Sequence, residues 1–508
     1  MWHAFAPAAR ATPAAKHGIE NQRKADLGDG TYLNPVLAGD RPDPSVLRVG
    51  ADYYMTHSSF FSYPGLLIWH SRDLVNWRPL GPALHKNVGS VWAPELVRHG
   101  QRYYIYFPGV QNGRAQNYVV YADKIEGPWS DPVDLNLPGK IDPGHIVAAD
   151  GKRFLFVDGG ERIGLAEDGL STVGKLEKVY GGWQYPQDWA VESPSLEGPK
   201  LFRRGGFYYL ISAQGGTAGP PTSHMVVMAR ATSLDGPWEN SPHNPVVHTA
   251  SKNERWWSRG HATLVDGPDG KPYLMYHGYE HGYYTLGRQT LLEPVQWTAD
   301  GWLQSAGADM ARPLPKPGND AVAHGMAYSD DFTTSKMGVQ WAFHEGTAAD
   351  SARIRYADGA LVVQGKGDSP RNATPLAFPA GDHGYQVDVE IEIEEHAKAG
   401  LLVFYNEKLY AGLGFDRDGL IAHRYGQDRP QRQADMPRKL YLRLVNDRNV
   451  VALYTSRDGQ QWTRYRTMME VSGYHHNVAG GFISLRPAIY AAGQGEVRFR
   501  HFRYQALP

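Results

Sequence analysis

The sequence predicts an all-β protein with two parts, a five-bladed β-propeller followed by a β-sandwich. Three observations lead to this fold class. A strand opening recurs five times at a step of roughly 50 residues, which is typical of propeller blades. Short strands with period-2 patterning follow a Pro-rich segment in the last third of the chain. No long stretch shows the 3.6-residue period of an amphipathic helix.

Each copy of the repeat places one polar residue shortly before a short aromatic strand. The five lead residues, in chain order, are Asp43, Glu95, Asp142, Glu197 and His261. In a propeller the first strand of every blade faces the central axis. We therefore expect the five lead residues to converge on that axis.

The chain divides into four parts on this pattern. Residues 1–31 form an N-terminal leader, 32–312 the propeller, 313–326 a Pro-rich linker and 327–508 the sandwich. In the last part, segments such as 385–393 and 399–405 alternate apolar and polar residues, as strands with one buried face do.

Composition narrows the classes of function. The chain has 508 residues, a net charge of -1 and no Cys, so disulfides, thiolate nucleophiles and zinc–thiolate sites are excluded. The near-zero net charge does not indicate binding to nucleic acid. No apolar run is long enough to span a bilayer. Ala9-Arg10-Ala11 is similar to a signal-peptide cleavage site, which predicts a periplasmic or secreted protein. An ordinary disordered leader on a cytoplasmic protein is the alternative.

Four of the five lead residues are acids, and the shared phase of three of them points to chemistry. An isolated Asp before Pro is usually a turn residue. Asp43, Asp142 and Glu197, however, all stand 9 to 11 residues ahead of a strand in the repeat. Glycoside hydrolysis needs one carboxylic acid and one carboxylate in a single cavity. Glu192 competes with Glu197 for the role of the acid, and the phase of the repeat favours Glu197.

Residues 32–302 resemble glycoside hydrolase family 43. The motifs that carry the resemblance, in chain order, are Arg41-Pro42-Asp43-Pro44-Ser45, Ser71-Arg72-Asp73-Leu74-Val75-Asn76-Trp77, Trp92-Ala93-Pro94-Glu95, Ile141-Asp142-Pro143, Glu197-Gly198-Pro199 and Gly260-His261. The resemblance implies a five-bladed propeller and an enzyme that inverts the anomeric configuration. The segment after Asp330-Asp331-Phe332 is similar to the concanavalin-like sandwich of β-xylosidases and α-L-arabinofuranosidases in this family.

The resemblance also implies a role for each site residue. Asp43 is the general base, Glu197 the general acid, and Asp142 modulates the pKa of the acid and orients it. Arg288 contacts the sugar in the deepest subsite. His261 is the central histidine, beside which relatives hold a calcium ion or a water, although no cofactor or metal is required here. Gly144 and His145, which follow Asp142-Pro143, depart from the serine and apolar residues of many relatives.

Together these observations predict an exo-acting inverting hydrolase that releases terminal α-L-arabinofuranose from hemicellulose side chains or oligosaccharides. Trp92 and Phe61 are candidate substrate-binding aromatics beside Arg288 and His261. A β-D-xylosidase using the same residues is the alternative, because both reactions need the same acid and base. A carbohydrate-binding propeller without catalysis is the alternative of another class. The expected partner is an oligosaccharide or polysaccharide, and the sequence does not indicate an oligomeric state.

Overall fold

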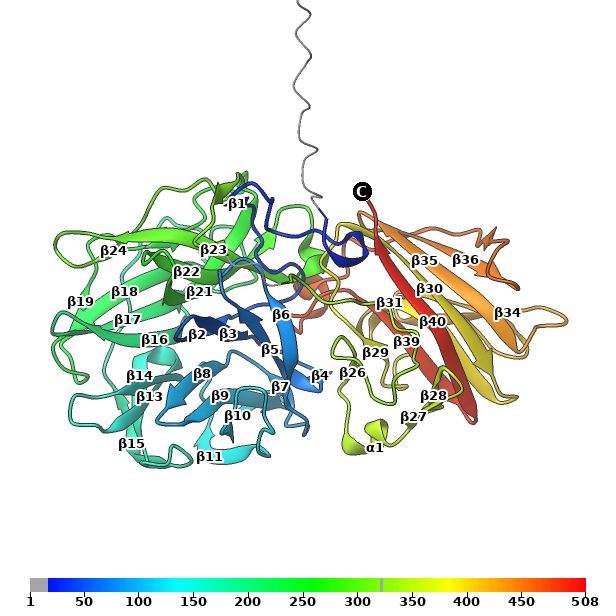
Figure 1. Cartoon of the computed structure of the whole chain (residues 1–508), viewed down its shortest axis with the longest axis horizontal. Coiled ribbons are helices and arrows are strands. Elements are labelled where there is room, and N and C mark those ends of the chain that lie inside the picture. The colour runs from blue at the N-terminus through cyan, green and yellow to red at the C-terminus, as the bar shows by residue number, and fades with distance from the viewer. Residues whose placement is uncertain (1–16, 320–322) are drawn as a thin grey trace, which may run out of the picture.

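The computed structural model describes residues 17–319 and 323–508, and strands dominate both parts (Figure 1). A propeller lies beside a sandwich, with the colour running from the blue first blade to the red last strand of the sandwich. The predicted fold class is confirmed. Ala9-Arg10-Ala11 lies outside the described residues, so export stays a prediction.

Within the described residues the propeller has five antiparallel blades, which follow one another in the order of the sequence. The first blade has β2 (Ser45–Val49), β3 (Asp52–Thr56), β5 (Gly65–Ser71) and β6 (Arg78–Leu84), and the second has β8 (Glu95–His99), β9 (Arg102–Gln111), β10 (Arg114–Ala122) and β11 (Val133–Pro138), with β7 (Ser90–Val91) beside β9. The third blade has β12 (Gly144–Val147), β13 (Arg153–Val157), β14 (Glu161–Leu165) and β15 (Thr172–Lys178), and the fourth has β16 (Leu196–Arg204), β17 (Phe207–Gln214), β18 (Met225–Ala231) and β19 (Glu239–Asn240), with β20 (Val247–His248) beside β18. The fifth blade has β21 (Trp256–Asp266), β22 (Pro272–Glu280), β23 (Arg288–Trp297) and β24 (Leu303–Ser305).

The segment before β2 closes the ring by lying along the last blade. Val36 N donates to Thr290 O at 3.0 Å, and Arg41 N donates to Arg288 O at 2.9 Å. A second closure pairs β1 (Thr31–Tyr32) with β25 (Leu314–Pro315), so part of the predicted linker is a strand. These contacts pair backbone groups that would otherwise form a sheet edge. They also fix Asp43 beside the fifth blade.

Two sheets make up the sandwich. The first has the order β34 (Gln427–Arg432), β33 (Gly419–Arg424), β32 (Leu409–Phe415), β31 (Ala397–Asn406), β39 (Arg486–Gly493), β29 (Leu376–Ala377), β26 (Ala342–His344) and β4 (Ser62–Tyr63). The second has the order β27 (Ile354–Ala357), β28 (Ala360–Gln364), β40 (Glu496–Ala506), β30 (Gly384–Ile393), β35 (Lys439–Asp447), β36 (Val450–Ser456) and β37 (Thr463–Arg464), with β38 (Met469–Glu470) beside β36. The helices α1 (Ala348–Ser351) and α2 (His476–Ala479) are single turns.

The two domains share backbone hydrogen bonds and one core. Strand β4 leaves the first blade and pairs with β26 as the edge strand of a sandwich sheet. One hydrophobic cluster runs from Trp69 in the propeller to Trp341 and Phe378 in the sandwich. Because burying such apolar area is the main favourable term in folding, the sandwich stabilises the propeller at this seam.

Residues 17–31, which the sequence assigned to a leader, pack against both domains. Arg23 forms an ion pair with Glu280 of the propeller at 2.8 Å, and its Nε donates to Gly381 O of the sandwich at 2.5 Å. Its neighbour Ala25 is 1% exposed. The leader prediction is therefore wrong for this stretch. Its Arg and Gln residues looked like a polar tail, but their partners lie more than 250 residues away in sequence.

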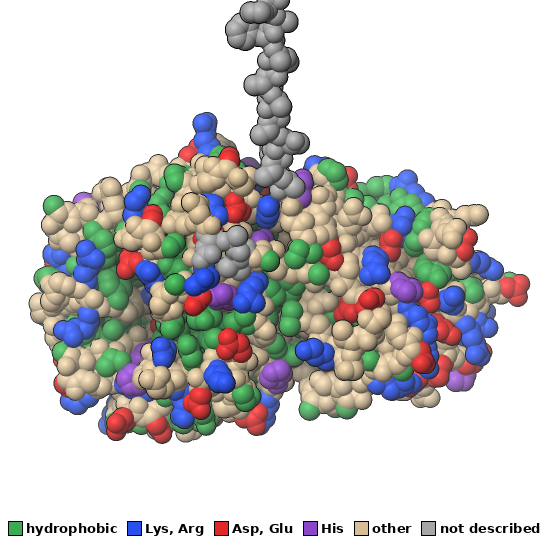
Figure 2. Space-filling view, viewed as in Figure 1, with side chains coloured by type: hydrophobic (Ala, Val, Ile, Leu, Met, Phe, Trp, Pro, Cys, Tyr) green, Lys and Arg blue, Asp and Glu red, His purple; other side chains and the backbone are tan. Residues whose placement is uncertain are grey.

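On the face shown in Figure 2, acidic and basic side chains are interspersed and no large patch of one sign is visible. Among the described residues, no helix is both long and apolar enough to cross a membrane.

Candidate active site

Four of the five lead residues meet at one end of the propeller axis. Asp43 and Asp142 stand two residues before β2 and β12, while Glu197 and His261 lie within β16 and β21. Asp43, Asp142 and His261 all have a positive φ, of 56°, 56° and 59°. Non-glycine residues rarely adopt this left-handed conformation, which costs of order 1 kcal/mol or more and gathers at functional sites. The shared conformation directs three side chains from different blades into one place.

Asp43 lies in a dense set of polar contacts. Ser58 Oγ donates to Asp43 Oδ2. Oδ1 lies 3.2 Å from Arg288 Nη1, 3.0 Å from His277 Nδ1 and 3.3 Å from His261 Nδ1. Burial alone would raise the pKa of Asp43, but Arg288, together with the two histidines, outweighs burial and holds that pKa well below its usual range. Asp43 is therefore ionised at neutral pH and can accept a proton.

Asp142 and Glu197 form a coupled pair with the opposite behaviour. Burial and then the carboxyls of Glu197 and Asp43 raise the pKa of Asp142 well above its usual range. Burial and the charge of Asp43 raise the pKa of Glu197 to about 7, although Arg288 opposes this. Because two close carboxyls resist ionising together, the pair holds a proton near neutral pH. One side of the site thus supplies a base and the other an acid.

Close contacts around Asp142 and Glu197 explain why a glycine follows shortly after each of these acids. Gly198 N donates to Asp142 Oδ2 at 3.1 Å, which ties Asp142 to the residue after Glu197. A Cβ on Gly198 would lie 2.9 Å from His261 Nε2, and φ there is +59°. A Cβ on Gly144 would lie 1.9 Å from Pro199 O. Gly144, which the sequence marked as a departure, therefore allows the third and fourth blades to approach each other.

Glu192, the competitor for the role of the acid, has a different position. Its Oε2 accepts hydrogen bonds from Ala218 N at 3.0 Å and Gly219 N at 2.9 Å. It thereby holds the loop that carries Thr217 in place. Thr217 Oγ1 lies 2.9 Å from His277 Nε2 and 3.4 Å from Arg288 Nη1. Glu197 is next to Gly198, which bonds to Asp142, and its pKa is raised, so it stays the predicted acid.

Aromatic rings from both domains surround Arg288. Its guanidinium lies 5.6 Å from the ring centre of Phe60 and 5.3 Å from that of Phe482, a residue of the sandwich. Trp92 meets Phe482 edge-on at 6.1 Å. Phe61, which the sequence selected, instead packs against His344 of the sandwich at 5.5 Å. Phe60 has a positive φ of 46° and Phe61 lies in the turn that follows, so the two rings contact different partners.

Glu95, the remaining lead residue, lies deeper along the axis. It forms a buried ion pair with Lys200 and accepts a hydrogen bond from Ser45 Oγ at 3.2 Å. Glu95 and Ser45 are the first residues of the inner strands β8 and β2, so Ser45, two residues after Asp43, corresponds to Glu95 in the first blade. Two residues along a strand move a side chain about 7 Å on the same face. The expectation that all five lead residues meet at one point is therefore wrong for Glu95.

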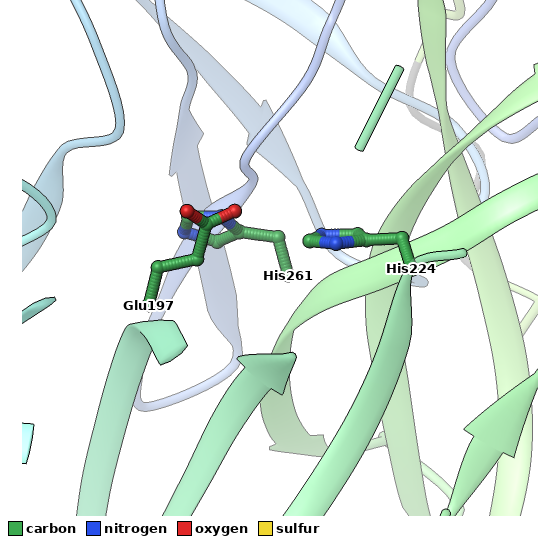
Figure 3. Close-up of side chains that lie close together, drawn as sticks. All are labelled: Glu197, His224 and His261. Carbon is green, nitrogen blue, oxygen red and sulfur yellow. The ribbon is translucent and has the colours of Figure 1, made fainter. Parts of the chain in front are cut away.

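Glu197, His224 and His261 place ligand atoms within 4.8 Å of one another, and among the described residues no other set of three or more His, Asp or Glu side chains does so. Figure 3 shows the His224 ring pointing toward the other two side chains. His224 Nδ1 donates to Gly215 O at 2.7 Å, so Nε2 carries the lone pair. Calcium takes about six to eight oxygen ligands, so a set with two ring nitrogens does not fit it. The calcium ion near His261 stays a prediction that these donors do not support.

Asp142→Asn is expected to move the alkaline limb of the pH profile of kcat/KM to lower pH. The acid must be protonated, so activity is lost as pH rises through the pKa of about 7 at Glu197. Near neutral pH the two carboxyls hold a proton between them, because the charge of one raises the pKa of the other. Asp142→Asn removes this interaction within the pair. Rates measured from about pH 4 to pH 9 would show this shift. An alkaline limb that stays in place would contradict the coupling of the two acids.

A buried ionised carboxylate facing a protonated one, with arginine and aromatic rings around them, is the arrangement of a glycoside hydrolase. Comparison with protein families agrees. The model of the family "Glycosyl hydrolases family 43" matches residues 32–303. The model of the family "Beta xylosidase C-terminal Concanavalin A-like domain" matches residues 329–505. The first match covers more than half of the chain, so the chain belongs to glycoside hydrolase family 43.

Named relatives of this chain fall into two activity groups. A non-reducing end α-L-arabinofuranosidase of Bacteroides ovatus is 31% identical over 79% of this chain and 78% of that protein. A β-xylosidase of Bacillus subtilis is 24% identical over 93% of this chain and 99% of that protein. The crystal structure of a xylan β-1,4-xylosidase of Bacillus halodurans superposes with a TM-score of 0.81 and 28% identity, covering 93% of this chain and 99% of the other. The prediction of a family 43 hydrolase is thus confirmed.

Proposed function

We propose that this chain is an exo-acting, inverting α-L-arabinofuranosidase that removes terminal arabinofuranose from hemicellulose side chains or oligosaccharides. The observation that carries the proposal is the opposed charge state of Asp43, with a lowered pKa, and Glu197, with a raised one. The similarity to the Bacteroides ovatus arabinofuranosidase supports the choice of sugar.

The proposed reaction uses the two carboxyls in a single displacement. Asp43 takes a proton from water, and the water oxygen attacks the anomeric carbon. Glu197 gives its proton to the glycosidic oxygen as that bond breaks. Arg288, held between Phe60 and Phe482, faces the pocket on the side of Asp43 and contacts the sugar hydroxyls. In the proposed complex the ring of Phe482, which lies against Arg288, limits the site on this side, and this suits removal of one terminal sugar.

A β-D-xylosidase is the second candidate, favoured by a specific observation. The Bacillus subtilis and Bacillus halodurans proteins, both named as xylosidases, match over 93% of this chain and so include the sandwich that carries Phe482. The acid and the base would be the same residues in both reactions.

Proton NMR of the released sugar separates these candidates. An aryl α-L-arabinofuranoside and an aryl β-D-xyloside are incubated in parallel with the enzyme, with Asp43→Asn as the inactive control. Faster release of arabinose with inverted configuration would support the proposal. Preferential release of xylose would move the specificity to the second candidate. Retained configuration would contradict the roles of Asp43 and Glu197, and no release of either sugar would contradict both substrate choices.

A further inference from the structure

A cavity lies at the seam between the two domains, lined in part by residues of β4 and β26. These two strands pair where the domains meet (Figure 1). The volume of the cavity is about 440 Å³, within the range of small-molecule sites. The carboxyls of the active site do not line it. Ser58 and Phe60 line it and also contact Asp43 and Arg288 of the active site. The cavity therefore adjoins the active site without including its carboxyls.

Two buried arginines line this cavity without an ion pair. Arg41 is 6% exposed and Arg486 is 3% exposed. Among the described residues, no carboxylate lies within 4 Å of either guanidinium, and the Nε atom of each has no hydrogen-bond partner. Arg41 Nη1 donates to Asp40 O at 2.8 Å, and Arg486 Nη2 donates to Tyr405 O at 3.0 Å. Arg486 also contacts His344 Nδ1 at 3.1 Å and Ser62 Oγ at 3.4 Å. None of these groups is a carboxylate, so neither guanidinium forms a direct ion pair.

Asp40 is the one acid among the described residues that line the cavity. Burial raises the pKa of Asp40 to about 6, although Arg288, Arg41 and Arg486 all oppose the shift. Arg288 is already committed to Asp43 at 3.2 Å. A single carboxylate therefore faces both cavity arginines, and one buried positive charge remains in excess. Buried charges are costly unless they are paired, so this cavity favours an anion.

The remaining walls are mostly apolar. Phe60, Leu67, Met337, Trp341 and Ile483 line the cavity from both domains. Rings and aliphatic chains of this kind bind an apolar body and do not favour a fully hydrated ion. Arginine is also the side chain that best matches a planar carboxylate, because its fork donates two parallel hydrogen bonds.

We propose that the seam cavity binds a small organic monocarboxylate with an apolar body, such as an aryl carboxylate. The carboxylate lies between Arg41 and Arg486, and the apolar body lies against Leu67 and Trp341. The carboxyls of the active site do not line this cavity, so the anion and the sugar occupy the protein at the same time.

Calorimetric titration of the full chain with benzoate, and with benzamide as the uncharged match, tests this proposal. Benzoate is expected to bind one per chain, at least about tenfold more tightly than benzamide, because only benzoate pairs with the arginines. Saturating L-arabinose is expected to leave benzoate binding unchanged. Equal affinity for the two probes, displacement by L-arabinose, or no saturable binding up to about 10 mM benzoate would each overturn the proposal.

Variants locate the site on the chain. Arg486→Met is expected to weaken benzoate binding at least about tenfold, with partial recovery in Arg486→Lys, because lysine keeps the charge and loses the fork. Arg429→Met, at an exposed position of β34, is the matched control and should leave binding unchanged. Val339→Trp adds bulk at a lining residue that is 42% exposed, where the fold tolerates change. It should weaken benzoate binding and leave hydrolysis intact, and unchanged binding in both Arg486→Met and Val339→Trp would place the anion elsewhere.

Discussion

Asp43→Asn is expected to lower kcat about 10⁴-fold while KM changes little, since general-base catalysis contributes roughly 10² to 10⁴. The amide has nearly the shape of the carboxylate, so Ser58 and Arg288 keep a hydrogen-bond partner. It cannot take a proton from the attacking water. Arg288 and the two histidines hold the pKa of Asp43 well below its usual range, so the native group is ionised at neutral pH.

Steady-state rates on one aryl glycoside, with Asp52→Asn as the matched control, check this expectation. Asp52 is in the same blade, at the first residue of β3, and contacts His70 and Arg72 outside the pocket. Azide needs no base to attack carbon, so it should restore part of the rate in Asp43→Asn by forming a glycosyl azide. Full activity in Asp43→Asn, or equal losses in both variants, would remove Asp43 from the mechanism.

The propeller and most of the candidate catalytic centre were predictable because they are periodic. A repeat of roughly 50 residues fixes the phase of each inner strand, and the phase brings Asp43, Asp142, Glu197 and His261 to one place. The limit of the same argument is Glu95. Glu95 is offset from the position of Asp43 by two residues along the strand. Its side chain therefore stays at the axis but lies beside Lys200. A sequence repeat defines the blade more accurately than it defines the depth along the axis.

Contacts between distant parts of the chain were not predictable in this way. Phe482 reaches Arg288 from the sandwich, and Arg23 joins Glu280 to Gly381 from a segment that looked like a leader. His277 could have drawn attention as a polar residue in an aromatic strand, where a fully buried imidazole needs a partner. Nothing local marks Phe482, because its role depends on how the two domains pack.

Glu197→Gln is expected to slow substrates with a poor leaving group about 10³-fold and to spare those with a good one, since general acids contribute roughly 10² to 10⁴. Glutamine keeps the shape of the side chain and cannot protonate the glycosidic oxygen. A 2,4-dinitrophenolate leaves without a proton, whereas a sugar or alkyl alkoxide does not. The alkaline limb of the pH profile should also disappear, because it reports the pKa of about 7 at Glu197.

Rates across a series of aryl and alkyl glycosides measure this dependence, and Glu192→Gln is the matched control. Glu192 holds the loop with Thr217 by accepting from Ala218 N and Gly219 N, and glutamine keeps an oxygen for that purpose. Glu192→Gln should therefore change all substrates by a similar, small factor. A loss that grows with the pKa of the leaving group in Glu192→Gln, and not in Glu197→Gln, would transfer the acid to Glu192. Because the two residues are five apart and both near the pocket, this comparison tests the assignment more sharply than either variant alone.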